Sequence, residues 1–436
     1  MLQIIHLIFF FLFILQPALV ALGFQESRFF SVIWLMVFLG LVIGRIIERK
    51  HDFPRLNFPL ALLIVALLTV AAIHGFEPKL LLNAGQFLIA VLTMYFLIYY
   101  VIFYEDEELF FAKVFASIPF YFYAALLIST VLTAYNAPDA PLLYVWQCNG
   151  IENRAQLMYG SGNHFGVYLS ALTLISAVYL VAQKRYFHIL TIGLAIGFLV
   201  ISGSRTGQVA IVLLPILLIF RLLRLHYGYL LAAISLAGVI IYLIVFNNDL
   251  YYYVYQFFLW VHERVPLRFM PEARYHLLAG REVLWNTLVE MIRSKPIWGH
   301  GYYIPFYDFG IDAGYEGGRL VGNETAPTSE SGLLFTVRYG VPATIVYLWF
   351  MVSPLLKRTR EHFEFYHVYL ILFAFCVWIL NDSLFISYSI QILFFLSVIA
   401  GHLALQKDAI ALRRYELVTK QIRPERPLSM LQDWNP

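Results

Sequence analysis

Charged residues are scarce in this sequence. They make up only 13% of its 436 residues, against about 25% in soluble globular domains, and hydrophobic residues make up 61%. A soluble globular fold is therefore excluded. The apolar runs are about 17 to 25 residues long, which is the length that a helix needs to cross a bilayer. Because they lack the alternation of transmembrane strands, we predict an all-α polytopic membrane protein.

Cysteine is nearly absent as well. Cys148 and Cys376 are the only two cysteines, and the 12 histidines are scattered, so neither a disulfide framework nor a metal site with HExxH-type spacing is predicted. The sequence shows no glycine-rich loop of the kind that binds nucleotides, and no cofactor is expected. The net charge of +3 is explained by membrane orientation, so we expect no nucleic-acid partner.

The apolar runs predict about twelve transmembrane helices. Lysine and arginine gather in alternate connections and in the C-terminal tail. Since short basic loops stay in the cytoplasm, both termini are predicted to be cytoplasmic. The predicted spans are residues 2–23, 29–47, 57–75, 80–104, 109–135, 165–183, 187–201, 207–223, 228–246, 332–354, 366–381 and 384–405.

This topology divides the chain into four parts. Residues 1–246 hold nine helices, residues 247–331 form one large periplasmic loop with amphipathic helices, residues 332–405 hold three more helices, and residues 406–436 form a basic cytoplasmic tail. Within the loop, apolar spacing predicts a helix from Arg281 that stops before Pro296. Long ordered loops are usually functional, so we expect the chemistry near this loop.

Four polar motifs fall on the predicted outer face. They are GSGNHF at 160–165, SGSRTG at 202–207, GREVLW at 280–285 followed by PIWGHG at 296–301, and SESG at 329–332 followed by Arg338 and Gly340. Their order and common side resemble the O-antigen polymerase and O-antigen ligase superfamily of bacterial surface polysaccharide assembly. The resemblance covers most of the chain from about residue 154 onward.

This resemblance implies a fold and an activity. The implied fold is GT-C-like, and the implied enzyme is a metal-independent glycosyltransferase of the inner membrane in lipopolysaccharide or related polysaccharide synthesis, with its active site facing the periplasm. The implied donor and acceptor are oligosaccharides linked to undecaprenyl pyrophosphate in the lipid bilayer. A separate chain-length regulator is the implied protein partner.

Arginines are the expected catalytic cations. Without a metal ion, a pyrophosphate leaving group needs guanidinium groups, which bind phosphate oxygens in pairs. Arg205 lies beside Ser204 in a turn whose backbone N–H groups can hold an oxyanion, and Arg281 lies at a predicted helix N-terminus. Arg338 lies about two turns inside a span, where an arginine is costly without a function. The structural alternatives are lipid contact for Arg205, a surface ion pair for Arg281 and pairing with Asp382 for Arg338.

One motif separates a polymerase from a ligase. Ligases of this superfamily usually carry a His-Asn pair before the glycine that corresponds to Gly340, and here Ser329 and Glu330 stand eleven and ten residues before it. This departure favours a polymerase and makes Glu330 the candidate base for the acceptor hydroxyl. Helix capping or pairing with Arg338 is the structural alternative for Glu330.

Two other functions are alternatives to a polymerase. The close alternative is an O-antigen ligase, or a protein O-oligosaccharyltransferase. A lipid-linked glycan flippase is the other alternative, although the 85-residue loop makes the two halves of the chain unlike, whereas transporters usually have repeated halves. Six polar residues are predicted to bind substrate: Asn163, His164, Ser204, His300, Tyr302 and Asp382. The structural alternatives are satisfaction of loop backbone for Asn163 and His164 and a turn position for His300.

Overall fold

The structure is a computed structural model of the whole chain. It describes residues 2–15, 18, 36–37, 39–41, 44, 56–104, 107–136, 162–183, 186–202, 211, 215–216, 219, 223, 227–247, 249–250, 252–254, 256, 260, 281–301, 331–356, 367, 370–372 and 391–422. Every regular element within these residues is a helix. The predicted all-α class is confirmed.

Most of the described helices are apolar. Four are long and apolar enough to cross a membrane: α5 (Pro78–Tyr104), α6 (Glu107–Asn136), α14 (Ser331–Leu356) and α16 (Gln391–Ile422). The other apolar helices are α1 (Leu2–Phe10), which η1 (Phe11–Leu15) continues, α4 (Phe58–Ile73), α8 (Gly162–Gln183), α9 (Phe187–Ser202) and α11 (Tyr227–Phe246). The chain is therefore a multi-pass membrane protein.

The described helices agree with the predicted spans to within a few residues, except at the C-terminal end of the chain. Of the predicted span 2–23, the structure describes residues 2–15 and 18. The predicted spans 29–47, 207–223 and 366–381 fall largely outside the described residues, so the total of about twelve stays a prediction. α16 continues to Ile422, well beyond the predicted span end at residue 405. Residues 406–422 contain no glycine or proline, and the first proline after them is Pro424, so nothing in this stretch stops the helix.

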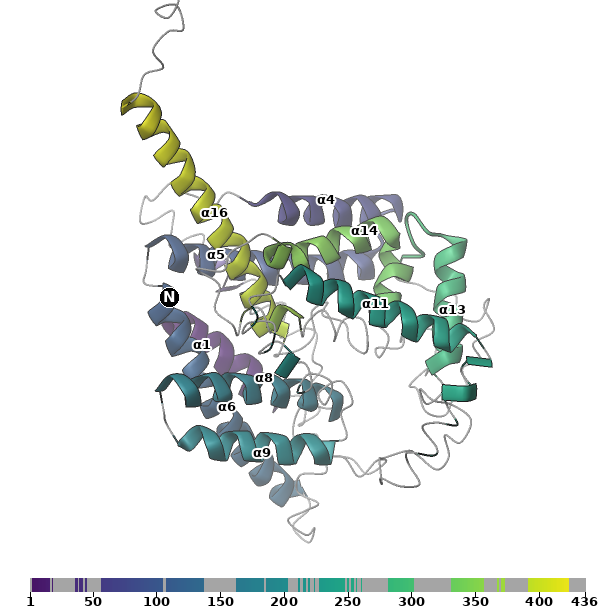
Figure 1. Cartoon of the computed structure of the whole chain (residues 1–436), viewed down its shortest axis with the longest axis horizontal. Coiled ribbons are helices and arrows are strands. Elements are labelled where there is room, and N and C mark those ends of the chain that lie inside the picture. Colours follow the sequence, from purple (N-terminus) through teal and green to yellow (C-terminus); the bar gives the residue numbers. More distant parts are fainter. Residues whose placement is uncertain are drawn as a thin grey trace, which may run out of the picture.

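The helices form two groups (Figure 1). α4, α5, α11, α14 and α16 lie in one group, and α1, α6, α8 and α9 lie in the other. Contacts between aromatic rings connect the helices of the first group. The ring centre of Phe87 on α5 lies 6.1 Å from that of Tyr347 on α14 and 5.3 Å from that of Phe395 on α16. His402 Nε2 of α16 lies 2.8 Å from the carbonyl oxygen of Phe350 on α14. These contacts fix α14, which carries part of the site described below.

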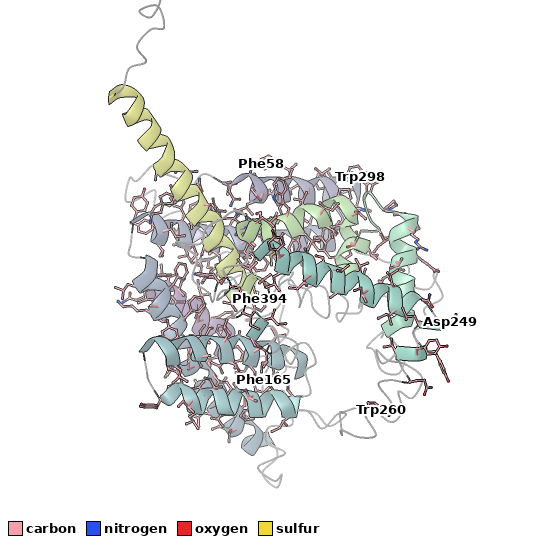
Figure 2. All side chains as sticks on the ribbon, viewed as in Figure 1. Phe58, Phe165, Asp249, Trp260, Trp298 and Phe394 are labelled. Atoms are coloured by element: carbon pink, nitrogen blue, oxygen red, sulfur yellow. The ribbon has the colours of Figure 1, made fainter. Side chains whose placement is uncertain are left out.

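The helix α13 (Arg281–Ser294) lies across one end of α14 (Figure 1). It begins at Arg281 as predicted, and it ends two residues before Pro296. Leu288 and Met291 of α13 are buried against Leu334 and Val337 of α14, while Glu290 and Arg293 are exposed, as expected for an amphipathic helix. Figure 2 shows Phe58 at the start of α4 and Trp298, which follows α13, near the other end of that helix. One end of the bundle thus gathers α4, α13 and α14.

Candidate functional site

α14 is interrupted at Gly340. This residue has φ 81° and ψ 167°, a conformation that is essentially restricted to glycine. Two residues later, Pro342 has no N–H, so the carbonyl of Arg338 has no helical donor. A Cβ at Gly340 would lie 2.1 Å from the carbonyl oxygen of Ile297. Gly340 and Pro342 together therefore cause the break in the helix.

The PIWGHG loop (residues 296–301) fills the break. Its backbone replaces the missing helical bonds, including the donor for the Arg338 carbonyl that Pro342 cannot supply. Irregular backbone near membrane depth is tolerated only where other protein groups satisfy it. The three bonds are Val341 N–H to the Pro296 carbonyl at 2.8 Å, His300 N–H to the Val337 carbonyl at 2.7 Å and Gly301 N–H to the Arg338 carbonyl at 3.1 Å.

The glycines of the loop permit this close approach. Gly299 and Gly301 have φ values of 69° and 79°, in the left-handed region that glycine reaches without cost. A Cβ at Gly299 would lie 2.5 Å from the carbonyl oxygen of Arg338. The glycine spacing of the motif thus serves the docking of the loop onto α14.

Gly340→Ala is expected to loosen this joint. The change puts a Cβ into the Ile297 carbonyl and forces alanine into a glycine-only conformation, which costs about 1–3 kcal/mol before the clash is counted. We expect a lower melting temperature in detergent by thermal fluorescence. Gly238→Ala on α11 is the matched control, because a Cβ there has open space. Equal melting temperatures for the two variants would show that the break is not stabilised by the loop.

His300 joins the loop to α13. Its Nε2 lies 3.0 Å from the Met291 carbonyl oxygen and 3.0 Å from Ser294 Oγ. Because a carbonyl only accepts, Nε2 carries the proton and Nδ1 the lone pair of the neutral ring. Burial lowers the pKa of His300, the hydrogen bond to the Met291 carbonyl opposes this effect, and electrostatic interaction with Lys295 and His74 lowers the pKa further. The ring is therefore held in its neutral form.

This depressed pKa predicts a pH dependence of stability. The unfolded chain takes up a proton at the ordinary histidine value of about 6.5, whereas the folded chain takes it up only at lower pH. The contribution of neutral His300 to the free energy of unfolding is therefore fully present above about pH 6.5, and it is lost as the pH falls below that value. Between pH 7 and pH 5, the melting temperature of the wild type should fall more than that of His300→Gln. An equal fall in both proteins would contradict the predicted role of the ring.

Arg338 lies at the same joint. It is half-buried, and its carbonyl is held by the loop. Arg338 and His300 are thus brought together by the fold from segments that are far apart in the chain. The other predicted site residues are not placed with them. The structure gives only the backbone of three of them: Asn163 and His164 in the first turn of α8, and Arg281 at the start of α13. Five lie outside the described residues: Ser204, Arg205, Tyr302, Glu330 and Asp382.

The turn between α4 and α5 also reaches the loop, and the sequence motifs did not include it. His74 Nε2 lies 3.0 Å from the carbonyl oxygen of Trp298. A Cβ at Gly301 would lie 2.9 Å from Glu77 Oε2 and 3.1 Å from His74 Nδ1. The available signal was a short HGFEP segment between two apolar runs, in which a histidine and a carboxylate share a connection of the predicted outer face.

A family model matches one part of the chain. Residues 190–348 match the family model described as O-antigen ligase. These residues are similar to the O-antigen ligase family, and the match supports a place in the O-antigen polymerase and ligase superfamily. The matched residues run from α9 to the middle of α14 and contain α13, the PIWGHG loop and Gly340. A search of curated proteins and a search of solved structures found no match.

The matched residues support the resemblance seen in the sequence. The match supports a function of the O-antigen ligase or polymerase type in general terms. The α4–α5 turn lies outside the matched residues.

Proposed function

We propose that this protein is a polysaccharide polymerase of the O-antigen polymerase and ligase superfamily. It transfers a glycan from undecaprenyl pyrophosphate to the end of another lipid-linked repeat unit, at the periplasmic face of the inner membrane. The observation that carries the proposal is the replacement of the usual ligase His-Asn pair by Ser329 and Glu330. Ligases use that pair for their lipid A-core acceptor, so its replacement favours a different acceptor.

Side chains of this protein can supply the base and the cations that the proposed reaction needs. The acceptor hydroxyl attacks the anomeric carbon of the donor, the bond from that carbon to the pyrophosphate oxygen breaks, and undecaprenyl pyrophosphate leaves. Glu330 takes the proton of the hydroxyl. Arg205, Arg281 and Arg338 bind the charge that builds up on the leaving group, in the manner of guanidinium groups on phosphate. Support for Arg338 comes from its place at the joint of α14 and the PIWGHG loop.

The products of the purified protein test the proposal. The protein is placed in liposomes with undecaprenyl-pyrophosphate-linked repeat units, with lipid A-core offered as a competing acceptor. A ladder of longer lipid-linked glycans is the expected result. Transfer to lipid A-core would identify a ligase, and movement of the repeat unit across the bilayer without a new linkage would identify a flippase. Either outcome would overturn the proposal.

The proposed periplasmic site also predicts which residues are accessible. In a background with Cys148→Ser and Cys376→Ser, a cysteine placed at Gly317 should react with an impermeant maleimide in intact spheroplasts. A cysteine at Lys357, in a predicted cytoplasmic loop, is the control and should react only after lysis. Labelling of Lys357→Cys in intact cells with protection of Gly317→Cys would invert the topology and exclude a periplasmic site.

A further inference from the structure

The α4–α5 turn (residues 74–77) is held in an unusual backbone conformation. Gly75 N–H donates to the Ala72 carbonyl at 3.0 Å and Phe76 N–H donates to the Ala71 carbonyl at 2.8 Å, which is the Schellman pattern of helix ends. Gly75 has φ 64°, as that pattern requires. Phe76 follows it with φ 56°, where a bulky side chain is strained. Strained residues of this kind cluster at functional sites.

Burial of the ring does not offset the strain at Phe76. The side chain is 57% exposed, so the conformation directs an aromatic ring outward rather than into the core. Trp298, whose carbonyl lies 3.0 Å from His74 Nε2, is also 45% exposed. Two partly exposed aromatic residues therefore lie near His74: Phe76 in the α4–α5 turn and Trp298 in the PIWGHG loop.

Two hydrogen-bond acceptors lie in the same region. The Trp298 carbonyl can only accept, so His74 Nε2 carries the proton and Nδ1 carries the lone pair when the ring is neutral. That Nδ1 atom and Glu77 Oε2 lie 3.1 Å and 2.9 Å from the position that a Cβ of Gly301 would take, closer than an ordinary van der Waals contact. Gly301 is in turn bonded to the carbonyl of Arg338. The acceptors thus adjoin the joint that carries Arg338.

This combination selects a class of ligand. Acceptors such as a carboxylate and an imidazole lone pair need hydrogen donors, and exposed aromatic rings pack against apolar faces. A sugar ring offers both hydroxyl donors and an apolar C–H face. A pyrophosphate offers neither and is repelled by a carboxylate, which separates this region from the arginines that suit the leaving group.

We propose that the α4–α5 turn is a sugar-binding subsite that holds the acceptor glycan. Glu77 and His74 accept hydrogen bonds from its hydroxyl groups, and Phe76 and Trp298 pack against its ring. The assignment of this glycan as the acceptor rests on the proposed polymerase function. Two structural roles compete with the subsite. Phe76 and Trp298 can belong to the aromatic belt at the membrane interface, and Glu77 stands directly before α5, where a carboxylate interacts favourably with the helix dipole. Both readings predict effects on stability alone.

Kinetics with a soluble acceptor separate these readings. The acceptor is the repeat unit on a short alkyl chain, and the donor is the undecaprenyl-pyrophosphate-linked unit at saturation. We expect Glu77→Gln and Phe76→Gly to raise the KM for the acceptor about tenfold, the scale of one lost charge-assisted hydrogen bond or ring contact, with kcat and the donor KM unchanged. Glu290→Gln is the matched control, because Glu290 is an exposed glutamate of α13.

Phe76→Gly keeps the test independent of folding. Glycine relieves the strain at φ 56°, so the variant should melt at the wild-type temperature or above while it binds the acceptor more weakly. A wild-type acceptor KM in both variants, with or without a change in melting temperature, overturns the subsite. If the wild type forms no product, the polymerase function fails, and calorimetric titration with the same soluble glycan decides the subsite. Weaker binding by Glu77→Gln than by Glu290→Gln supports it, and equal binding overturns it.

Discussion

Arg281→Ala should reduce the transfer rate by about 10²- to 10³-fold, the cost of removing one preorganised group that stabilises developing negative charge. Arg281 is the first residue of α13, where the helix N-terminus itself favours a phosphate. α13 is fixed to α14 through the buried contacts of Leu288 and Met291, so the position of its N-terminus is set by the rigid part of the fold. The rate is measured with the purified protein and lipid-linked repeat units, and Arg205→Ala is expected to have an effect of the same size.

Lysine variants show whether the geometry of the guanidinium matters. Arg281→Lys and Arg205→Lys keep the charge but lose the paired hydrogen bonds to phosphate oxygens, so they should restore little activity. Arg293→Ala is the control, because Arg293 is an exposed arginine in the last turn of the same helix, and it should keep the wild-type rate. Full activity in both lysine variants would mean that these arginines only contact lipid headgroups or surface partners.

The local elements were predictable from sequence because each depends on residues close together in the chain. Apolar spacing and Pro296 gave the bounds of α13, and the apolar runs gave α4, α5, α6, α8, α9 and α11 to within a few residues. The resemblance of the motifs was enough to identify the family that residues 190–348 match. In these cases the pattern and its physical cause lie within one helix.

The interrupted helix and the joint of the site were not predictable in this way. Gly340 and Pro342 stand inside an apolar run that is long enough to be one uninterrupted span, and the run does not show that the backbone of residues 296–301 completes it. His74 and Trp298 are 224 positions apart. The chemistry of the α4–α5 turn therefore becomes visible only when the packing of α4 against α14 has been established. A hydropathy pattern gives the side of the membrane for such a connection, but not its neighbours.

Glu330→Gln should lower the transfer rate by about 10²-fold or more. Glu330 directly precedes α14, which begins at Ser331, and Arg338 lies two helical turns further on at the joint with the PIWGHG loop. Glutamine keeps the size and the hydrogen bonding of the side chain but cannot take the proton of the acceptor hydroxyl. The KM values for donor and acceptor should stay close to those of the wild type, because a group that acts only in the transition state lowers kcat and kcat/KM together.

The control for Glu330→Gln is Glu330→Asp, which keeps a carboxylate on a shorter side chain. A base predicts that the aspartate variant retains more activity than the glutamine variant, and that the fall of the rate at acidic pH disappears in the glutamine variant. A helix cap predicts similar rates in both variants and a lower melting temperature in at least one. If the glutamine variant polymerises at the wild-type rate, Glu330 is not the base. The proton must then pass to another group near the joint, such as the Nδ1 atom of neutral His300, or to the substrate itself, and His300→Gln becomes the variant that distinguishes these two routes.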